Sequence, residues 1–151
     1  MITYAEALRR LMEKAVPVEG METVPLLYST HRVLAEGIVS PIAVPGWDNS
    51  QMDGYAVRAA ELAEASEDHP VVLPVSDRIP AGQVGSRLAQ GSVARIFTGA
   101  PMPEGADTVV PQENVEVTPE GVCFKSPVRE GAWVRRRGSD VPQGGVVLKK
   151  G

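Results

Sequence analysis

The run from residue 45 to residue 56 gathers polar and aromatic side chains in a stretch rich in turn formers. It places the carboxylates of Asp48 and Asp53 close in sequence to the amide of Asn49 and the hydroxyl of Ser50. Asp and Asn side chains can bond the backbone two residues onward, which fixes a compact turn and leaves the other oxygens facing a ligand or a metal. The same residue types fill ordinary turns, so a purely structural role is an equally open interpretation. We expect no core strand in this run.

A second polar segment, residues 98–107, directly follows an apolar strand at residues 94–97. Gly99 lets the backbone approach a ligand closely, and successive amides near Thr98 suit an anion-binding concavity. The alternative is a stiff connection that binds nothing, since Gly and Pro are the usual residues of loops.

Three consecutive arginines, residues 135–137, precede a Gly-Ser turn that ends at Asp140. Successive strand residues face opposite sides, so Arg135 and Arg137 share one face and at most two of the three arginines can bind one phosphate. A solvent-exposed edge strand is the alternative. Glu113 is a further carboxylate near the strand ends, although such a residue is more often simply exposed.

The overall charge argues against two classes of partner. A net charge of -4 and a pI near 5.2 provide no broad cationic field for nucleic acid or an anionic membrane surface. No stretch approaches the roughly 20 apolar residues that a membrane span needs. The single Cys123 cannot form an internal disulfide and the N-terminus has no leader pattern, so we expect a cytoplasmic protein. His31 and His69 lack a second ligand at metal-binding spacing and receive no catalytic role.

Hydrophobic periodicity and turn residues predict a mainly β (α+β) chain with a few helices. Thr3 and Glu6 form a capping-box pattern that begins a helix, which Pro17 ends. Two short helices are expected, at residues 30–36 and 58–65. Strands are expected at residues 71–75, 93–98, 107–112, 115–118, 122–125, 133–136 and 146–148, with a hairpin turn at 118–121.

Three segments taken together resemble the molybdopterin molybdenumtransferases, the family that includes the gephyrin E domain. The first signature segment is Pro45–Val57, the second is Thr98–Asp107 and the third is Arg137–Val141. The likeness runs from the opening helix to Gly151 in the family's order, and it includes Val109–Glu113 between the second and third segments.

The resemblance implies an enzyme that takes adenylylated molybdopterin and molybdate, cleaves the adenylate with a divalent cation such as Mg²⁺, and leaves molybdenum on the dithiolene. Family members are longer, with a molybdopterin-binding α/β domain and a C-terminal β domain that this chain lacks. Their active cleft forms across a homodimer. We therefore expect this length to supply one wall of the cleft and to be inactive alone.

The resemblance also assigns site residues by matching positions. Asp48 and Asp140 match the functionally required acids, which handle the cation or its bound water. Mg²⁺ is usually held by one or two carboxylates together with substrate oxygens, so either acid is a candidate metal ligand. The implied wall residues of the cleft are Asn49, Ser50, Asp53, Tyr55, Thr98, Gly99 and Arg137.

The fold implied by the resemblance consists of bifurcated, coiled β-sheets. An elongated domain holds both chain ends, at about residues 1–43 and 128–151, and a second β-rich domain is inserted at about residues 44–127. Prolines near residues 41–45 and 126–127 mark the expected crossings.

Two other readings come from different classes of protein. This length can act as a non-catalytic dimerisation or protein-interaction module, because it stops before the substrate-binding domain of the family. A β-rich binding protein for another small anion would account for the arginines and glycine loops. That reading leaves the first signature segment unexplained.

Overall fold

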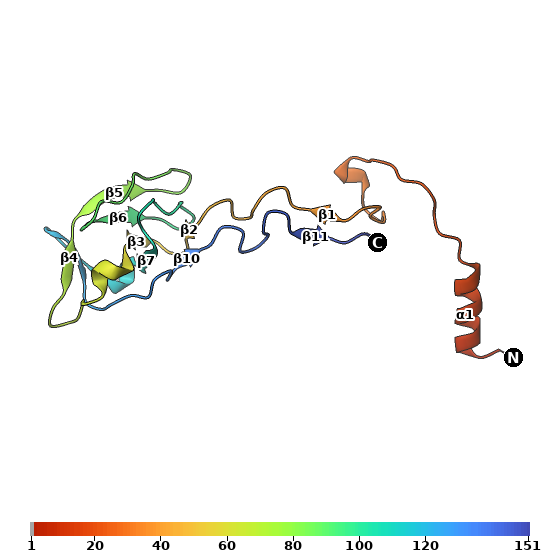
Figure 1. Cartoon of the computed structure of the whole chain (residues 1–151), viewed down its shortest axis with the longest axis horizontal. Coiled ribbons are helices and arrows are strands. Elements are labelled where there is room, and N and C mark those ends of the chain that lie inside the picture. Colours follow the sequence, from red (N-terminus) through yellow and green to blue (C-terminus); the bar gives the residue numbers. More distant parts are fainter. Residues whose placement is uncertain (1) are drawn as a thin grey trace. The chain divides into compact units, whose positions relative to one another are not determined.

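Short strands dominate the computed structural model, which describes residues 2–151 and is mainly β with one α-helix in that range (Figure 1). The chain divides into two compact units, Met1–Gly37 with Lys149–Gly151, and Ile38–Leu148. The helical elements are α1 (Tyr4–Lys14) and the 3-10 helices η1 (Leu26–Tyr28), η2 (Ala59–Leu62) and η3 (Gln112–Asn114). The strands are β1 (Ile38–Val39), β2 (Asn49–Ser50), β3 (Gly54–Val57), β4 (Val71–Leu73), β5 (Val75–Ile79), β6 (Val93–Ile96), β7 (Thr108–Pro111), β8 (Glu116–Thr118), β9 (Gly121–Phe124), β10 (Val134–Arg135) and β11 (Val146–Leu148).

The opening helix α1 confirms the predicted start. The Thr3 hydroxyl accepts from the Glu6 amide at 3.3 Å and so satisfies one unpaired donor of the first turn. The Glu6 carboxylate pairs with Arg9 at 2.8 Å and Arg10 at 2.7 Å, rather than reaching back to the Thr3 amide. Among residues 2–151, no helix is both long and apolar enough to cross a membrane.

The other two predicted helices differ from the structure. Residues 30–36 form turns and bends, because His31 takes a φ of +65°, which a right-handed helix does not accommodate. The helix predicted at residues 58–65 shortens to η2, which buries Leu62 completely. The amide of Ala59, the first residue of η2, donates to the Asp107 carboxylate at 2.9 Å.

A four-stranded sheet with the order β5-β6-β3-β7 forms the centre of the Ile38–Leu148 unit (Figure 1). Strand β3 lies between β6 and β7, and all four of its residues are buried. The expectation that residues 45–56 contain no core strand is therefore wrong. Residue sizes account for the difference: Gly54 and Ala56 allow close packing, while Tyr55 and Val57 fill a core cluster.

A three-stranded antiparallel sheet, β4-β9-β8, packs through the same core cluster, in which Leu62, Val93 and Phe124 are buried. Its β8–β9 hairpin confirms the predicted turn, with Thr118 opposite Gly121. A second cluster, built from Ala56, Ile79, Leu88, Ala94, Ile96, Ala100, Val109 and Val134, contains residues of all four strands of the central sheet. Core side chains thus fix the position of the loops that leave this sheet.

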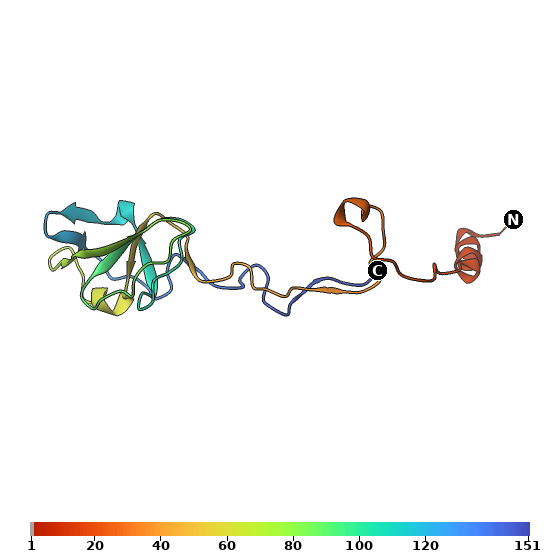
Figure 2. The same ribbon diagram turned by 90° about the horizontal axis from the view of Figure 1, so that it is seen from above.

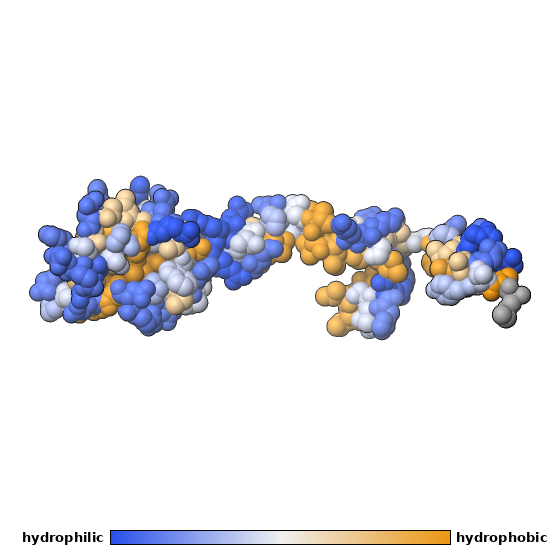
Figure 3. All heavy atoms as spheres, turned by 90° about the horizontal axis from the view of Figure 1, so that it is seen from below, coloured by the Kyte–Doolittle hydropathy of each residue, from blue (hydrophilic) through white to orange (hydrophobic). Residues whose placement is uncertain are grey.

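Most predicted strands are present within a residue or two, whereas the strands β1, β2, β3 and β5 were not predicted. Strands β1 and β11 run side by side as an antiparallel ribbon in both views (Figure 1 and Figure 2). Apolar residues gather on the surface of this ribbon (Figure 3). They are exposed by 42–64%, namely Ile38, Val39, Val146, Val147 and Leu148.

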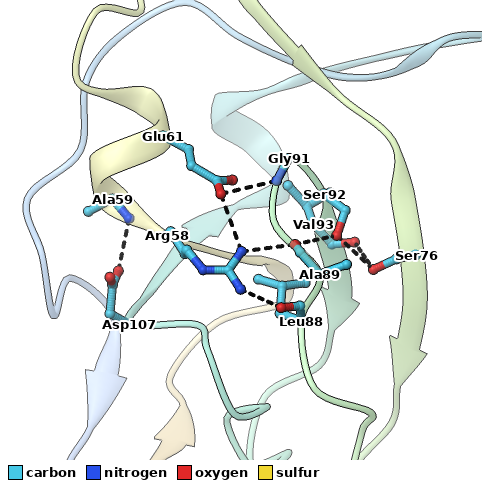
Figure 4. Close-up of polar contacts among 10 residues, drawn as sticks. All are labelled: Arg58, Ala59, Glu61, Ser76, Leu88, Ala89, Gly91, Ser92, Val93 and Asp107. Atoms are coloured by element: carbon cyan, nitrogen blue, oxygen red, sulfur yellow. Dashed lines mark hydrogen bonds and ion pairs between the residues drawn. The ribbon is translucent and has the colours of Figure 1, made fainter.

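Arg58 fastens the long connection between the parallel strands β5 and β6 to the sheet (Figure 4). Its guanidinium donates to the Ala89 carbonyl at 2.8 Å and to the Leu88 carbonyl. It also pairs with Glu61 at 3.3 Å, and the same carboxylate accepts from the Gly91 amide at 3.1 Å. The Arg58 and Glu61 side chains are only 24% and 17% exposed, so solvent replaces these contacts poorly.

We predict that Arg58→Met lowers the free energy of unfolding by about 2–3 kcal/mol, because it removes the donor to the Leu88 carbonyl, one donor to the Ala89 carbonyl and the cation beside the partly buried Glu61 carboxylate. Urea denaturation measures the change. The matched control is Arg87→Met, since Arg87 is 75% exposed and meets Glu104 only at 3.6 Å. A loss in the control as large as in Arg58→Met would contradict this account.

Gly54 has no room for a side chain at the start of β3. A Cβ atom there would lie 2.1 Å from the Val110 carbonyl oxygen. We predict that Gly54→Ala destabilises the chain by about 3 kcal/mol or more, because backbone must move. Gly46→Ala is the control, since an added Cβ meets nothing within 4 Å. Thermal unfolding compares the two, and equal stability would show that β3 is not packed as described.

Candidate functional site

The first signature segment lies between the other two. Strand β2 pairs with β10, which ends two residues before the third signature segment, and this pairing places Asn49 opposite Arg135 and Ser50 opposite Val134. On its other side, Asn49 forms a bridge with Pro101 of the second signature segment. The Ser50 carbonyl also accepts from the Gly99 amide at 2.9 Å, and the Ser50 amide donates to the Ala100 carbonyl at 3.0 Å. Three stretches far apart in sequence are thus hydrogen-bonded side by side.

Asp48 clamps the first signature segment to the third. Its Oδ1 accepts from the Arg137 amide and its Oδ2 accepts from the Arg136 guanidinium, both at 2.7 Å. Partial burial raises the pKa of Asp48, but these two hydrogen bonds and the charge of Arg136 outweigh burial and hold the pKa below its ordinary value. A backbone hydrogen bond also joins the two segments, because the Gly138 amide donates to the Pro45 carbonyl at 2.9 Å.

Asp140 is held by the same run of arginines. Its carboxylate pairs with the Arg135 guanidinium and accepts from the Ser139 hydroxyl at 3.3 Å, and its amide donates to the Val44 carbonyl at 3.0 Å. Residues 135–137 therefore position both predicted acids in one region. Their side chains remain 34% exposed at Asp48 and 42% exposed at Asp140.

The three arginines do not form one phosphate clamp. Strand β10 ends at Arg135, so the alternation expected for a longer strand does not extend to Arg137. Arg135 binds Asp140, Arg136 binds Asp48, and the Arg137 guanidinium donates to Gln143 at 3.0 Å. Each arginine thus has a partner within the chain.

Asp53 and Thr98 form a second acidic contact. The Asp53 Oδ1 accepts from both the amide and the hydroxyl of Thr98, each at 2.8 Å. These two bonds, led by the amide, lower the pKa of Asp53, and the charge of Arg95 adds to the effect. Its Oδ2 accepts no hydrogen bond from any residue in the described range 2–151. One oxygen of a charged carboxylate therefore points away from the contacts that hold the side chain.

Of the two interpretations of residues 98–107, the hydrogen bonds favour the stiff connection over the anion-binding concavity near Thr98. The Thr98 amide donates to Asp53, the Gly99 amide donates to Ser50, and the Ala100 amide donates to Phe97 at 2.9 Å. Gly99 takes a φ of +81° to make this turn. The loop uses its amides to hold the first signature segment, so they are not available to an anion.

Several predicted wall residues lie inside the protein. Ser50 is 2% exposed and its hydroxyl donates to the Met52 carbonyl at 2.6 Å. Tyr55 is 7% exposed and belongs to the core cluster. Asn49 is half-buried, and its buried Oδ1 has no hydrogen-bond partner among residues 2–151. Contact of these three side chains with a substrate stays a prediction, and their visible role is to support the backbone.

Arg95 is a site residue that sequence reasoning missed. It donates to the Gly54 carbonyl at 2.8 Å and to the Gln112 side chain at 2.5 Å, while the Gln112 amide donates to the Asp53 carbonyl at 3.0 Å. Glu113 accepts from the Gln112 side chain at 3.2 Å. A charged residue inside the apolar strand β6 was the available signal, because such a charge needs partners in a folded core.

A groove of about 550 Å³ borders the Asp48 clamp. Trp47 and Arg137 line it together with Val44 and Gln143. Its walls combine an exposed indole with a guanidinium, which suits a planar or anionic group. No three His, Cys, Asp or Glu side chains gather into a potential metal site anywhere in residues 2–151. A cation held here by one or two carboxylates would take its remaining ligands from elsewhere.

Comparison with known proteins assigns the mainly β fold and its three signature segments to one family. Residues 2–151 match the family described as MoeA N-terminal region (domain I and II), and the chain belongs to this family. The molybdopterin molybdenumtransferase of Synechococcus elongatus is 38% identical over 153 residues, covering 99% of this chain and 38% of that protein. The Bacillus subtilis molybdopterin molybdenumtransferase is 42% identical over 155 residues, covering 99% of this chain and 36% of that protein.

A solved structure confirms the likeness in three dimensions. The molybdopterin biosynthesis MoeA protein of Pyrococcus horikoshii superposes with a TM-score of 0.92 at 37% identity, covering 100% of this chain and 40% of that one. The chain thus spans well under half the length of the relatives it matches.

The pH dependence of folding stability tests the contacts of Asp48. Because the folded-state pKa of Asp48 lies below the ordinary 3.8, its charge stabilises the folded chain above that pH, and the contribution is lost as pH falls through the folded-state pKa. We predict that Asp48→Asn costs about 1 kcal/mol at neutral pH, a value reduced for partial solvent exposure, and that this cost shrinks below about pH 4.

Urea denaturation across this pH range measures the difference between the two proteins. Glu120→Gln removes an exposed acid from a turn and serves as the control, with an expected change under about 0.5 kcal/mol. A cost of Asp48→Asn that stays constant down to pH 2 would show that the charge of Asp48 does not carry the clamp.

Proposed function

We propose that this chain forms one wall of the site at which molybdenum from molybdate is inserted into adenylylated molybdopterin. Membership of the MoeA N-terminal region family supports this proposal. The observation that carries it is the meeting of three polar signature segments, which brings Asp48 and Asp140 to one arginine run and fixes Asp53 against Thr98. The substrates are anionic, and such chemistry needs fixed charges and a cation.

The three acids are suited to different roles. Both oxygens of Asp48 are engaged by Arg137 and Arg136, which suits it to positioning. One oxygen of Asp53 has no partner among the described residues, which suits it to a cation or a proton. Asp140 is held by a solvent-exposed ion pair, which is weak enough to open. We therefore favour Asp53 and Asp140 as the residues that contact the reacting groups.

The donor set fits Mg²⁺ held jointly by protein and substrate. Carboxylate oxygens from Asp53 or Asp140 would supply one or two ligands, and substrate oxygens would supply others. A bound Mg²⁺ would offset the charge that develops on a phosphate when the adenylate is cleaved. Thr98 keeps the Asp53 carboxylate charged and oriented, and Arg137 contributes a cation to the adjoining groove.

We also propose that the site is completed by a homodimer partner in the cytoplasm. Exposed apolar side chains support an association, since a monomer rarely leaves so many in water. They lie on the β1–β11 ribbon and, within the Met1–Gly37 unit, at Leu11, Met12, Leu26, Leu27 and Tyr28. The division into an elongated domain of coiled, bifurcated sheets and an inserted domain at residues 44–127 belongs to the same proposal.

A chimera tests the function. This chain, joined to the remaining domains of the Synechococcus elongatus molybdenumtransferase, is expected to insert molybdenum into adenylylated molybdopterin. Asp53→Asn in the chimera is expected to lower turnover at least 100-fold, because it removes the charge while keeping the shape of the side chain. Molybdenum cofactor formed per minute is the measurement.

Asp68→Asn serves as the control, because that carboxylate is exposed and lies outside the signature segments. Its turnover is expected to stay within about threefold of the parent chimera. Full turnover by a folded Asp53→Asn chimera would reject the proposed role. It would leave the alternative that this length is a non-catalytic dimerisation or interaction module, which the exposed apolar residues also support.

A further inference from the structure

A row of charged and aromatic residues crosses the central sheet next to the Asp53–Thr98 contact. Arg78 on β5 lies opposite Arg95 on β6, and Arg95 lies opposite Tyr55 on β3. Residues directly opposite in neighbouring strands place their side chains on the same face. Phe97 follows Arg95 by two residues and therefore extends the same face. Two guanidinium groups thus share one face of the sheet with two aromatic rings.

Both guanidinium groups lie against the same ring. The Cζ atoms of Arg78 and Arg95 are 4.6 and 4.5 Å from the centroid of Phe97. At these distances the ring attracts each cation, which holds the head of Arg78 although its side chain is exposed. Like charges at opposed positions of neighbouring strands normally destabilise a sheet. The Phe97 ring offsets only part of this repulsion.

The two arginines differ in what else they bind. Arg95 is committed to the Gly54 carbonyl, the Ile96 carbonyl and the Gln112 side chain. The Arg78 guanidinium donates to no group and joins no ion pair within residues 2–151. Its planar fork of donors is therefore directed to solvent beside Phe97.

None of the acids around this row is ion-paired with Arg78. Asp77 precedes Arg78 and faces the other side of β5, where its oxygens accept from the Ser86 and Arg78 amides at 2.8 and 2.7 Å. The charge of Asp53 acts on Arg95, and Glu113 accepts from the Gln112 side chain. Arg78 therefore has no ion-pair partner among residues 2–151 at this edge of the sheet.

We propose that Arg78, stacked on Phe97 beside Arg95, binds a phosphoryl group. A guanidinium fork matches two oxygens of a tetrahedral phosphate, and a stacked, preoriented fork loses less freedom on binding than a mobile side chain. The assignment of this group to the phosphate of the adenylylated substrate rests on the proposed function. Arg78 would then orient this phosphate, while Asp53 and Asp140 would supply ligands to the cation.

Titration of the 151-residue chain with inorganic phosphate at constant ionic strength tests this inference. The Nε–H resonances of arginine and the amide of Thr98 report binding by NMR. Saturable shifts are expected at Arg78, and Arg78→Gln is expected to weaken phosphate binding at least tenfold. Arg87→Gln removes the same charge from an exposed side chain and is expected to change binding less than twofold.

Unchanged phosphate binding in Arg78→Gln, or an equal loss in Arg87→Gln, would overturn the inference. A parallel titration with molybdate distinguishes the source of the oxyanion, because tighter binding of molybdate than of phosphate would overturn the assignment to a phosphoryl group. Failure here is separable from failure of the proposed function. If Arg78→Gln binds phosphate as well as the parent chain and the Asp53→Asn chimera is inactive, only the role of Arg78 is rejected.

Discussion

The carboxylate of Asp48 is the contact on which the arrangement of the signature segments depends. It accepts the Arg137 amide and the Arg136 guanidinium, which lie almost ninety positions further along the chain. Strand β2 begins at the next residue and is only two residues long, so backbone pairing alone would hold it weakly. The clamp fixes the Asn49–Arg135 end of this short ladder, and the Gln51 amide, which donates to the Trp133 carbonyl at 2.9 Å, continues it at the other end.

The chemistry of the site follows from competition for hydrogen bonds. Each arginine of the 135–137 run and each of the Thr98, Gly99 and Ala100 amides is bonded within the chain, which makes the loops rigid and leaves these three amides unavailable to an anion. Among residues 2–151, one oxygen of Asp53 and the guanidinium of Arg78 have no partner. A half-site of this kind supplies preoriented groups and leaves the rest of the coordination to substrate and to other domains.

Sequence patterns predicted those parts of the structure that local interactions decide. The Thr3 cap of α1, the turn at residues 118–121 and the apolar strand β6 each depend on neighbours in the chain. Strand β3 escaped prediction because Gly54 and Tyr55 gain their strand conformation from the strands on both sides of them. The residue types of the site were predictable from the sequence, but the partner of each acid was not. Asp48 could have paired with any of three arginines, and Arg95 reaches the site only through tertiary contacts.

Hydrogen exchange at the Arg137 amide in the 151-residue chain tests the central claim most directly, because this amide donates to a carboxylate rather than to a strand partner. The account predicts exchange at least about 100-fold slower than in an unstructured peptide, comparable with the amides of β6. Exchange at the unstructured rate, with β6 still protected, would show that Asp48 does not hold the two segments together.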